Sequence, residues 1–239
     1  MKKIIALLLL VVLFSACRFT GGRRVRGNGN VIMQNRNIGS FSGVRVLGGM
    51  DAVLRSGTAY AVNVETDANL QKYILTNREG DVLVIRTRNG YNLHSDNNIK
   101  IYVTAPALEE ITIGGSGSVT SAEKLAGSRK LQIHVNGSGD VKLDVDAPEV
   151  EAETNGSGTI ILAGTTKQFS AEINGSGDFK CFNLLSENTG VEISGSGDAQ
   201  VFASKQLNID IRGSGDVAYK GTPAIRQRNA GSGSVRNVQ

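Results

Sequence analysis

A Gly-Ser-Gly triplet occurs seven times from residue 115 onward, and this repeat constrains the fold more than any other feature. Successive serines of the triplets are 22, 19, 19, 20, 18 and 18 residues apart. They are Ser116, Ser138, Ser157, Ser176, Ser196, Ser214 and Ser232. Such regular spacing is typical of repeat proteins, in which each unit stacks on its neighbour because it cannot bury its apolar face alone.

The residues around each triplet alternate between apolar and other side chains with a period of two. The second residue after the triplet is apolar in all seven copies, from Val119 to Val235, and Ile111 and Ile113 precede the first triplet in the same phase. This alternation predicts half-buried strands. Glycine suits a sharp corner between them because it tolerates positive φ and close approach of chains. We therefore predict an all-β fold, a parallel β-helix-like β-solenoid of about seven coils of 18–22 residues.

The last repeat departs from the pattern. Gln227 and Asn229 stand where most earlier copies have apolar residues. Polar residues at an end coil shield the open stack, so we interpret this repeat as a terminal cap.

Residues 28–106 carry many β-strand signals but no regular triplet. We predict a less regular N-terminal β region there, with one short helix from Asp67 to Ile74 capped by Asp67. The predicted organisation is a signal peptide (1–16), a lipidated tether (17–27), the N-terminal β region (28–106) and the solenoid (107–239).

The first residues have the pattern of a signal peptide: Lys2 and Lys3, an apolar run from Ile4 to Phe14, small residues, and Cys17. The run is too short to span a bilayer as a helix, which needs roughly 20 residues. Residues 14–17 resemble a lipobox, which implies cleavage before Cys17 and lipidation of its sulfur. Several acyl chains give durable anchoring. We expect a cell-envelope protein with the membrane as partner, in the outer membrane, while the leaflet stays open.

Removal of residues 1–16 leaves 223 residues and lowers the formal charge from +4 to +2. This balance argues against nucleic acid as a partner. Apart from Cys17, Cys181 is the only cysteine, so a disulfide framework or cysteine metal cluster within the chain is excluded. Cys181 occupies an apolar position of its repeat, and we predict a buried thiol that behaves as a small hydrophobic side chain.

Two further segments, taken together with the repeat, resemble a known protein family. They are Asn37-Ile38-Gly39-Ser40-Phe41-Ser42-Gly43-Val44 and Gly48-Gly49-Met50-Asp51-Ala52-Val53-Leu54. With the repeated Gly-Ser-Gly-Asp, they resemble the autotransporter-adhesin head GIN domain family over roughly residues 37–239. The resemblance implies an exported lipoprotein or envelope protein, a β-helical fold and a role in adhesion. It implies no catalytic or binding residues.

The triplets carry no hydrolase signal. Only His94 and His134 could act as imidazole bases for seven equivalent serines, and the corner lacks the Gly-x-Ser-x-Gly spacing of a nucleophile elbow. The aspartates that follow four triplets resemble calcium-binding β-rolls, but the period here is twice the nine residues of those repeats. We expect these aspartates to bond locally to the corner backbone. No catalytic residue and no cofactor are predicted.

Four consecutive repeats carry an acid three residues before the triplet, and these acids are the candidate ligand-binding residues. In stacked coils the equivalent positions lie about 4.8 Å apart. The predicted outward stripe must be screened by solvent, paired with bases, partly protonated, or occupied by a cation, for which calcium suits hard oxygen ligands best. Solvent screening is the default expectation, and no metal site is assigned. The acids are Glu153, Glu172, Glu192 and Asp210.

Three functions remain open. The favoured one is a non-catalytic envelope protein that binds a protein or glycan along a solenoid face. A β-helical carbohydrate-active enzyme would need paired carboxylates and aromatic sugar platforms, but the chain has no Trp and only 5% aromatic residues. A structural or self-assembling spacer would use the open end of the stack, which the polar last repeat disfavours. The sequence leaves the oligomeric state open.

Overall fold

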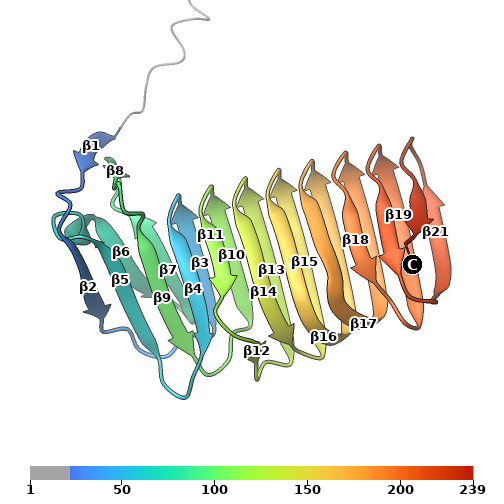
Figure 1. Cartoon of the computed structure of the whole chain (residues 1–239), viewed down its shortest axis with the longest axis horizontal. Coiled ribbons are helices and arrows are strands. Elements are labelled where there is room, and N and C mark those ends of the chain that lie inside the picture. The colour runs from blue at the N-terminus through green and yellow to red at the C-terminus, as the bar shows by residue number, and fades with distance from the viewer. Residues whose placement is uncertain (1–21, 239) are drawn as a thin grey trace, which may run out of the picture.

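The computed structural model describes residues 22–238, and in this range the fold is an elongated all-β stack (Figure 1). The predicted signal peptide, Cys17 and the first residues of the tether lie outside the described residues. No helix between residues 22 and 238 has the length and apolar character needed to span a bilayer. The predicted β-solenoid is confirmed.

Each coil contributes one strand to each of two faces, here called the first face and the second face. The strands of the first face come directly before the Gly-Ser-Gly corner in the sequence, and those of the second face come directly after it. Strands β16 and β17 are long, and each runs from the second face of one coil into the first face of the next. The first face contains β3 (Gly43–Gly48), β10 (Glu110–Gly115), β13 (Lys130–Gly137), β15 (Glu149–Gly156), the later parts of β16 (Thr159–Gly175) and β17 (Asp178–Gly195), β19 (Gln206–Gly213) and β21 (Ala224–Asn229). The second face contains β4 (Asp51–Ser56), β11 (Ser118–Ser121), β14 (Asp140–Asp146) with the short β12 (Leu125–Ala126), the earlier parts of β16 and β17, β18 (Ala199–Phe202), β20 (Val217–Lys220) and β22 (Val235–Asn237).

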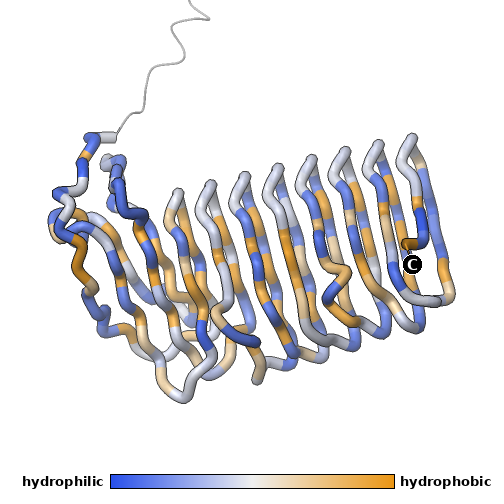
Figure 2. The backbone as a smooth tube through the Cα atoms, viewed as in Figure 1, coloured by the Kyte–Doolittle hydropathy of each residue, from blue (hydrophilic) through white to orange (hydrophobic). Residues whose placement is uncertain are grey.

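Neighbouring coils pair in parallel and in register with the repeat. Ile133 lies beside Ala152, and Ala152 beside Ala171, so equivalent residues form continuous rows. The inward rows of both faces are buried in one apolar core, and apolar and polar residues alternate along the strands (Figure 2). The period-two pattern of the sequence therefore predicts correctly which side chains point inward.

The corners depend on glycine at the first triplet position. Gly195, for example, has φ +142°, and a Cβ there would overlap the carbonyl oxygen of Gly175 in the coil below. Ser196 donates its backbone N–H to the same carbonyl at 2.8 Å. The triplet thus forms a sharp corner and joins each coil to the one before it.

The aspartates after the triplets bond between coils, and the predicted local bonding is wrong. Oδ1 of Asp216 accepts the backbone N–H of Ser234 at 2.7 Å, and Oδ1 of Asp198 accepts that of Asp216 at 2.9 Å. The parallel register places the N–H of the equivalent residue in the next coil within reach of the carboxylate. Asp140 bonds in the same way to Thr159.

The N-terminal region continues the stack and then covers it. Strands β7 and β9 pair in parallel with β3 and β4, and antiparallel strands follow outward, with β6 on β7, β5 on β9 and β2 on β5. Strands β1 and β8 form a separate parallel ribbon. The bounds are β1 (Arg23–Arg26), β2 (Val31–Arg36), β5 (Ala61–Asp67), β6 (Ile74–Glu79), β7 (Val82–Thr87), β8 (Tyr91–His94) and β9 (Lys100–Ala105).

The predicted helix from Asp67 to Ile74 is wrong. Only a single 3-10 turn, η1 (Gln71–Tyr73), is present, and it has no side-chain cap. The Asp67 carboxylate instead accepts the backbone N–H of Gly29 and the hydroxyl of Ser95. Long-range bonding to these loops outweighs the local capping signal.

Candidate ligand-binding face

The predicted acidic stripe lies on the outer surface of the first face. Glu153 pairs in register with Glu172, Glu172 with Glu192, and Glu192 with Asp210. The row continues to Arg228 in the last coil. Parallel stacking therefore brings together the four acids that the spacing of the sequence selected.

Most of the stripe acids have a polar partner nearby. The His134 Nδ1 atom lies 3.1 Å from Oε2 of Glu153. Asn174 donates to Glu172 at 2.9 Å, and Arg212 donates to Asp210 at 2.7 Å. Glu192 has no ion pair or side-chain hydrogen bond within residues 22–238. The charge of the stripe is thus partly offset at its two ends and least offset in the middle.

A ladder of asparagine amides runs beside the stripe. Asn174 donates to the side-chain oxygen of Asn155, and Asn155 to that of Asn136, each at 3.1 Å. Asn155 also donates to Glu153 at 2.7 Å. With the bond from Asn174 to Glu172, the ladder orients the first two carboxylates of the stripe.

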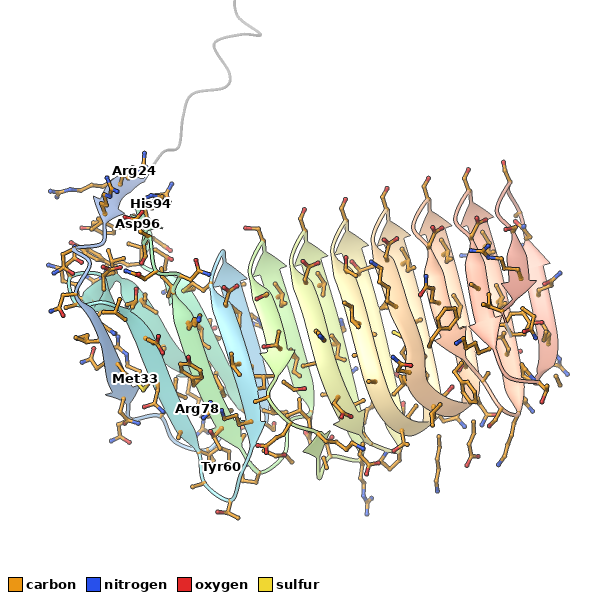
Figure 3. All side chains as sticks on the ribbon, viewed as in Figure 1. Arg24, Met33, Tyr60, Arg78, His94 and Asp96 are labelled. Carbon is orange, nitrogen blue, oxygen red and sulfur yellow. The ribbon has the colours of Figure 1, made fainter. Side chains whose placement is uncertain are left out.

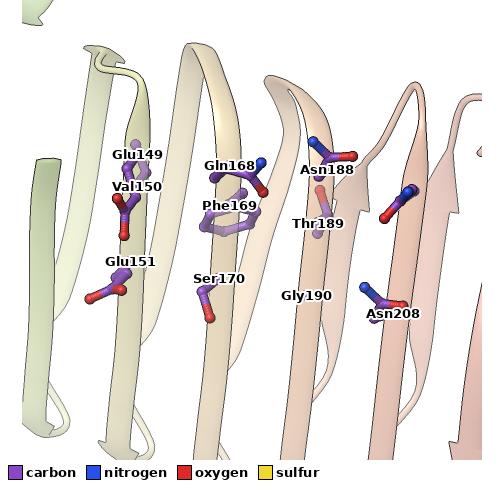
Figure 4. A pocket seen from close by; sticks show the side chains of 11 residues that line it. Glu149, Val150, Glu151, Gln168, Phe169, Ser170, Asn188, Thr189, Gly190 and Asn208 are labelled. Atoms are coloured by element: carbon purple, nitrogen blue, oxygen red, sulfur yellow. The ribbon is translucent and has the colours of Figure 1, made fainter. Parts of the chain in front are cut away.

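A depression of about 530 Å³ lies next to the stripe on the same face (Figure 4). Its floor follows the row of Ser170, Gly190 and Asn208, which are in register with one another. Because serine and glycine have small side chains, the longer residues of the adjacent rows form walls around them. The lining residues are Glu149, Val150, Glu151, Gln168, Phe169, Ser170, Asn188, Thr189, Gly190, Gln206 and Asn208.

Lys130 pairs with two glutamates that line the depression, Glu149 and Glu151. Its Nζ atom lies 2.6 Å from Oε1 of Glu151 and 3.1 Å from Oε1 of Glu149. Hydrogen bonding to Lys130 lowers the pKa of Glu151, and the two glutamates raise the pKa of Lys130. Glu151 is therefore an anionic hydrogen-bond acceptor at neutral pH.

Two smaller depressions extend the same surface along the stripe. One is lined by residues that include His134, Glu153 and Glu172, and the other by Glu192 and Asp210 together with two arginines of the last coil, Arg226 and Arg228. Together with the larger depression they form a shallow polar groove, lined by carboxylates, amides and hydroxyls and basic at its C-terminal end. Such a surface can donate and accept many hydrogen bonds.

Two particular arrangements, a metal-binding cluster and a histidine bonded to a corner serine, are absent from the part of the chain that the structure describes. No three His, Cys, Asp or Glu side chains gather there to hold a metal ion. No hydrogen bond among the described residues joins either histidine to a corner serine, because His134 contacts Glu153 and His94 lies near Asp96.

Cys181 is buried in the core, as the repeat predicts. Desolvation raises the pKa of its thiol to about 12, so the thiol stays protonated and unreactive at neutral pH.

The sequence predicts the stripe but not the larger depression beside it. The floor row of Ser170, Gly190 and Asn208 has no chemical signature of its own. Its one signal in the sequence is a change of size along the row: the long side chains of Gln132 and Glu151 are followed in the next two coils by the small residues Ser170 and Gly190.

The profile described as putative auto-transporter adhesin, head GIN domain, matches residues 40–223. A comparison with curated proteins found no match. The fold is similar to a putative adhesin from Bacteroides fragilis, at 20% identity and TM-score 0.83, with 90% of this chain and 100% of that chain covered. It is also similar to a putative lipid binding protein from Parabacteroides distasonis, at 27% identity and TM-score 0.73, with 91% of this chain and 100% of that chain covered. A putative adhesin from Parabacteroides merdae aligns at 24% identity and TM-score 0.66, with 91% of this chain and 100% of that chain covered.

Proposed function

The chain belongs to the family described as putative auto-transporter adhesin, head GIN domain, and on this basis we propose that it is a non-catalytic cell-envelope lipoprotein that binds a protein or glycan ligand. The binding surface is the polar groove of the first face. Relatives with this fold include proteins described as putative adhesins, which agrees with a role in binding.

The regular array of carboxylates and amides is the observation that carries this proposal. Glu153, Glu172, Glu192 and Asp210 stand at the spacing of stacked strands, about 4.8 Å, beside a depression with a small-residue floor. A long ligand with repeating polar groups can bond to successive coils at once. Each bond is weak, but linked contacts raise the overall affinity through effective concentration.

The anchor of the proposed lipoprotein is Cys17. We expect cleavage before this residue and acylation of its sulfur, with the protein held on the outer membrane. Intact-mass measurement of membrane-fraction protein should give the chain from Cys17 onward plus acyl groups. A soluble product that keeps Met1, or a Cys17→Ala variant that stays anchored, would contradict this assignment.

Binding is tested with glycan and envelope-protein arrays on the purified mature protein. The Glu172→Gln, Glu192→Gln double variant should lose the hits of the parent. The matched control is Glu109→Gln, Glu123→Gln, which removes two exposed acids outside the groove and should keep them. Equal binding by both variants would remove the stripe from the site, and arrays without hits would count against a binding function.

The enzyme alternative is tested with a broad screen for glycan and ester hydrolysis. We expect no turnover, because a hydrolase needs a nucleophile, base and orienting group in contact. Turnover that disappears on replacement of one groove carboxylate, such as Glu151→Gln, would replace the binding proposal by a carbohydrate-active enzyme.

A further inference from the structure

The N-terminal end of the stack differs in charge from the solenoid. Residues 22–106 contain eleven Lys and Arg against six Asp and Glu, whereas residues 107–223 contain nine against sixteen. The asymmetry is strongest at the beginning, since residues 22–36 contain four arginines and no acid. A basic end thus adjoins an acidic body.

The arginines of β1 are exposed cations at this end of the molecule. Among the described strands β1 pairs with β8 alone, in a ribbon separate from the main sheet, and Figure 3 places Arg24 at the N-terminal end of the molecule. Arg26 pairs with Asp96 at 3.1 Å. Arg23 and Arg24 are exposed and form no ion pair with any residue between 22 and 238, so their guanidinium groups are available to an external anion.

An exposed apolar strip lies at the same end. Strand β2 pairs on one side with β5, and no strand within residues 22–238 pairs with its other side. Its Val31, Ile32 and Met33 side chains are 39%, 39% and 59% exposed. Half of the large exposed hydrophobic side chains in the described part of the chain are these three consecutive residues. Figure 3 shows Arg24 and Met33 apart from each other but at the same end of the molecule. Cationic and apolar groups exposed on one surface are the combination that binds at the interface of an anionic bilayer.

We infer that this end, formed by β1 and β2, docks on an anionic membrane surface, with Arg23 and Arg24 on lipid phosphates and Met33 in the interfacial layer. The inference rests in one respect on the proposed function: a lipid on Cys17 would keep Gly22 within about 18 Å of the bilayer, the maximum reach of five residues. A second copy is a poorer occupant, because two such ends would bring arginines against arginines. Docking at this end would direct the stack and its groove away from the membrane.

The test uses the mature chain without lipid, beginning at Arg18. The buried core begins at Phe41, so no core residue is removed, and far-UV circular dichroism checks the fold. The protein is floated with vesicles of phosphatidylcholine mixed with phosphatidylglycerol, and with vesicles of phosphatidylcholine alone, at low and high salt. We expect binding to the anionic vesicles only, weakened by salt.

Matched variants locate the contact. Arg23→Gln, Arg24→Gln should lower the partition coefficient on anionic vesicles by roughly fivefold per charge, whereas Lys142→Gln, Lys180→Gln removes two exposed charges from the second face and should leave it unchanged. Met33→Gln should weaken binding, and Leu185→Gln, a control at a side chain 51% exposed, should not.

Absence of binding to anionic vesicles, or equal loss in the test and control variants, would overturn the docking surface. A parent protein that dimerises and loses its dimer on Met33→Gln, without binding vesicles, would assign β2 to a second copy and also overturn it. The assay contains no acyl chain and no array ligand, so its failure is separate from failure of the Cys17 anchor or of groove binding.

Discussion

The first glycine of a corner, such as Gly195, combines a positive φ with close approach to the coil before it. Gly195 has φ +142° and faces the Gly175 carbonyl, whereas Gly190, in the same strand, has open space around its missing Cβ. Gly195→Ala should lower the free energy of unfolding by about 1–3 kcal/mol or more, because it adds backbone strain and a clash. Gly190→Ala should have no such cost. Urea unfolding followed by circular dichroism measures both, and equal values would refute this account of the corners.

The Asp216 carboxylate stabilises the last coil by accepting two hydrogen bonds from Ser234. Bonds from the backbone N–H and the hydroxyl of Ser234 lower the pKa of Asp216. A lowered folded-state pKa means that its stabilisation is intact at neutral pH and is lost as the pH falls through the folded pKa, below the ordinary aspartate range. Asp216→Ala should therefore speed hydrogen exchange at the Ser234 amide at neutral pH. Acid should produce less further change in the variant than in the parent, and an identical acid response would contradict the mechanism.

At the scale of the strand, the stripe acids are predicted to repel one another weakly. Glu192 lies between Glu172 and Asp210 and has no hydrogen-bond or ion-pair partner among residues 22–238, while Glu153 contacts His134 and Asn155. Glu192→Gln should raise the free energy of unfolding by about 0.5 kcal/mol at low salt, because it removes repulsion between adjacent strands. Glu153→Gln should not, because it also loses favourable contacts. High salt should reduce the difference between the two variants.

The effect of calcium on thermal stability distinguishes a stripe that is screened by solvent from one that binds a cation. We expect the parent to melt at the same temperature with calcium and with chelator, since solvent and the side-chain partners already offset the charge. A calcium-dependent rise that disappears when Glu153, Glu172, Glu192 and Asp210 are all replaced by their amides would instead make the stripe a metal site.

The elements that obey the repeat could be predicted from the sequence, and those that depend on distant contacts could not. The alternation around each triplet predicts the inward rows because a strand has a strict period of two. The coil that contains Gly48-Gly49-Met50-Asp51 lacks the serine and so falls outside the triplet repeat, yet Gly48 lies beside Gly115 and Asp51 beside Ser118. The local sequence predicts Asp67 as a helix cap, but its actual partners, Gly29 and Ser95, are distant in the sequence and could not be identified from it. The groove floor depends on which side chains are small relative to their neighbours in adjacent coils.

For the molecule as a whole, a parallel stack has two ends, and they are protected differently. Antiparallel strands β2, β5 and β6 cover the N-terminal end. At the other end β21 is exposed along its full length, with Arg226 and Arg228 directed outward and Gln227 and Asn229 in the rows of Ile209 and Ile211. Charged and polar residues on an edge strand discourage pairing with another chain, which argues against the self-assembling spacer.

The polar edge is predicted to prevent end-to-end growth. Replacing Arg226 and Arg228 by Thr, and Gln227 and Asn229 by Ile, would extend the apolar rows by one coil and leave an uncharged strand with free backbone donors and acceptors. We expect this variant to form oligomers whose mass rises with concentration in sedimentation velocity, under conditions where the parent mass is constant. The control is Lys142→Thr, Lys180→Thr, which removes charge from strands already paired on both sides and should behave like the parent. If the β21 variant keeps the parent mass at every concentration, charge and polarity on this strand are not what limits the stack, and backbone geometry at the last coil must do so.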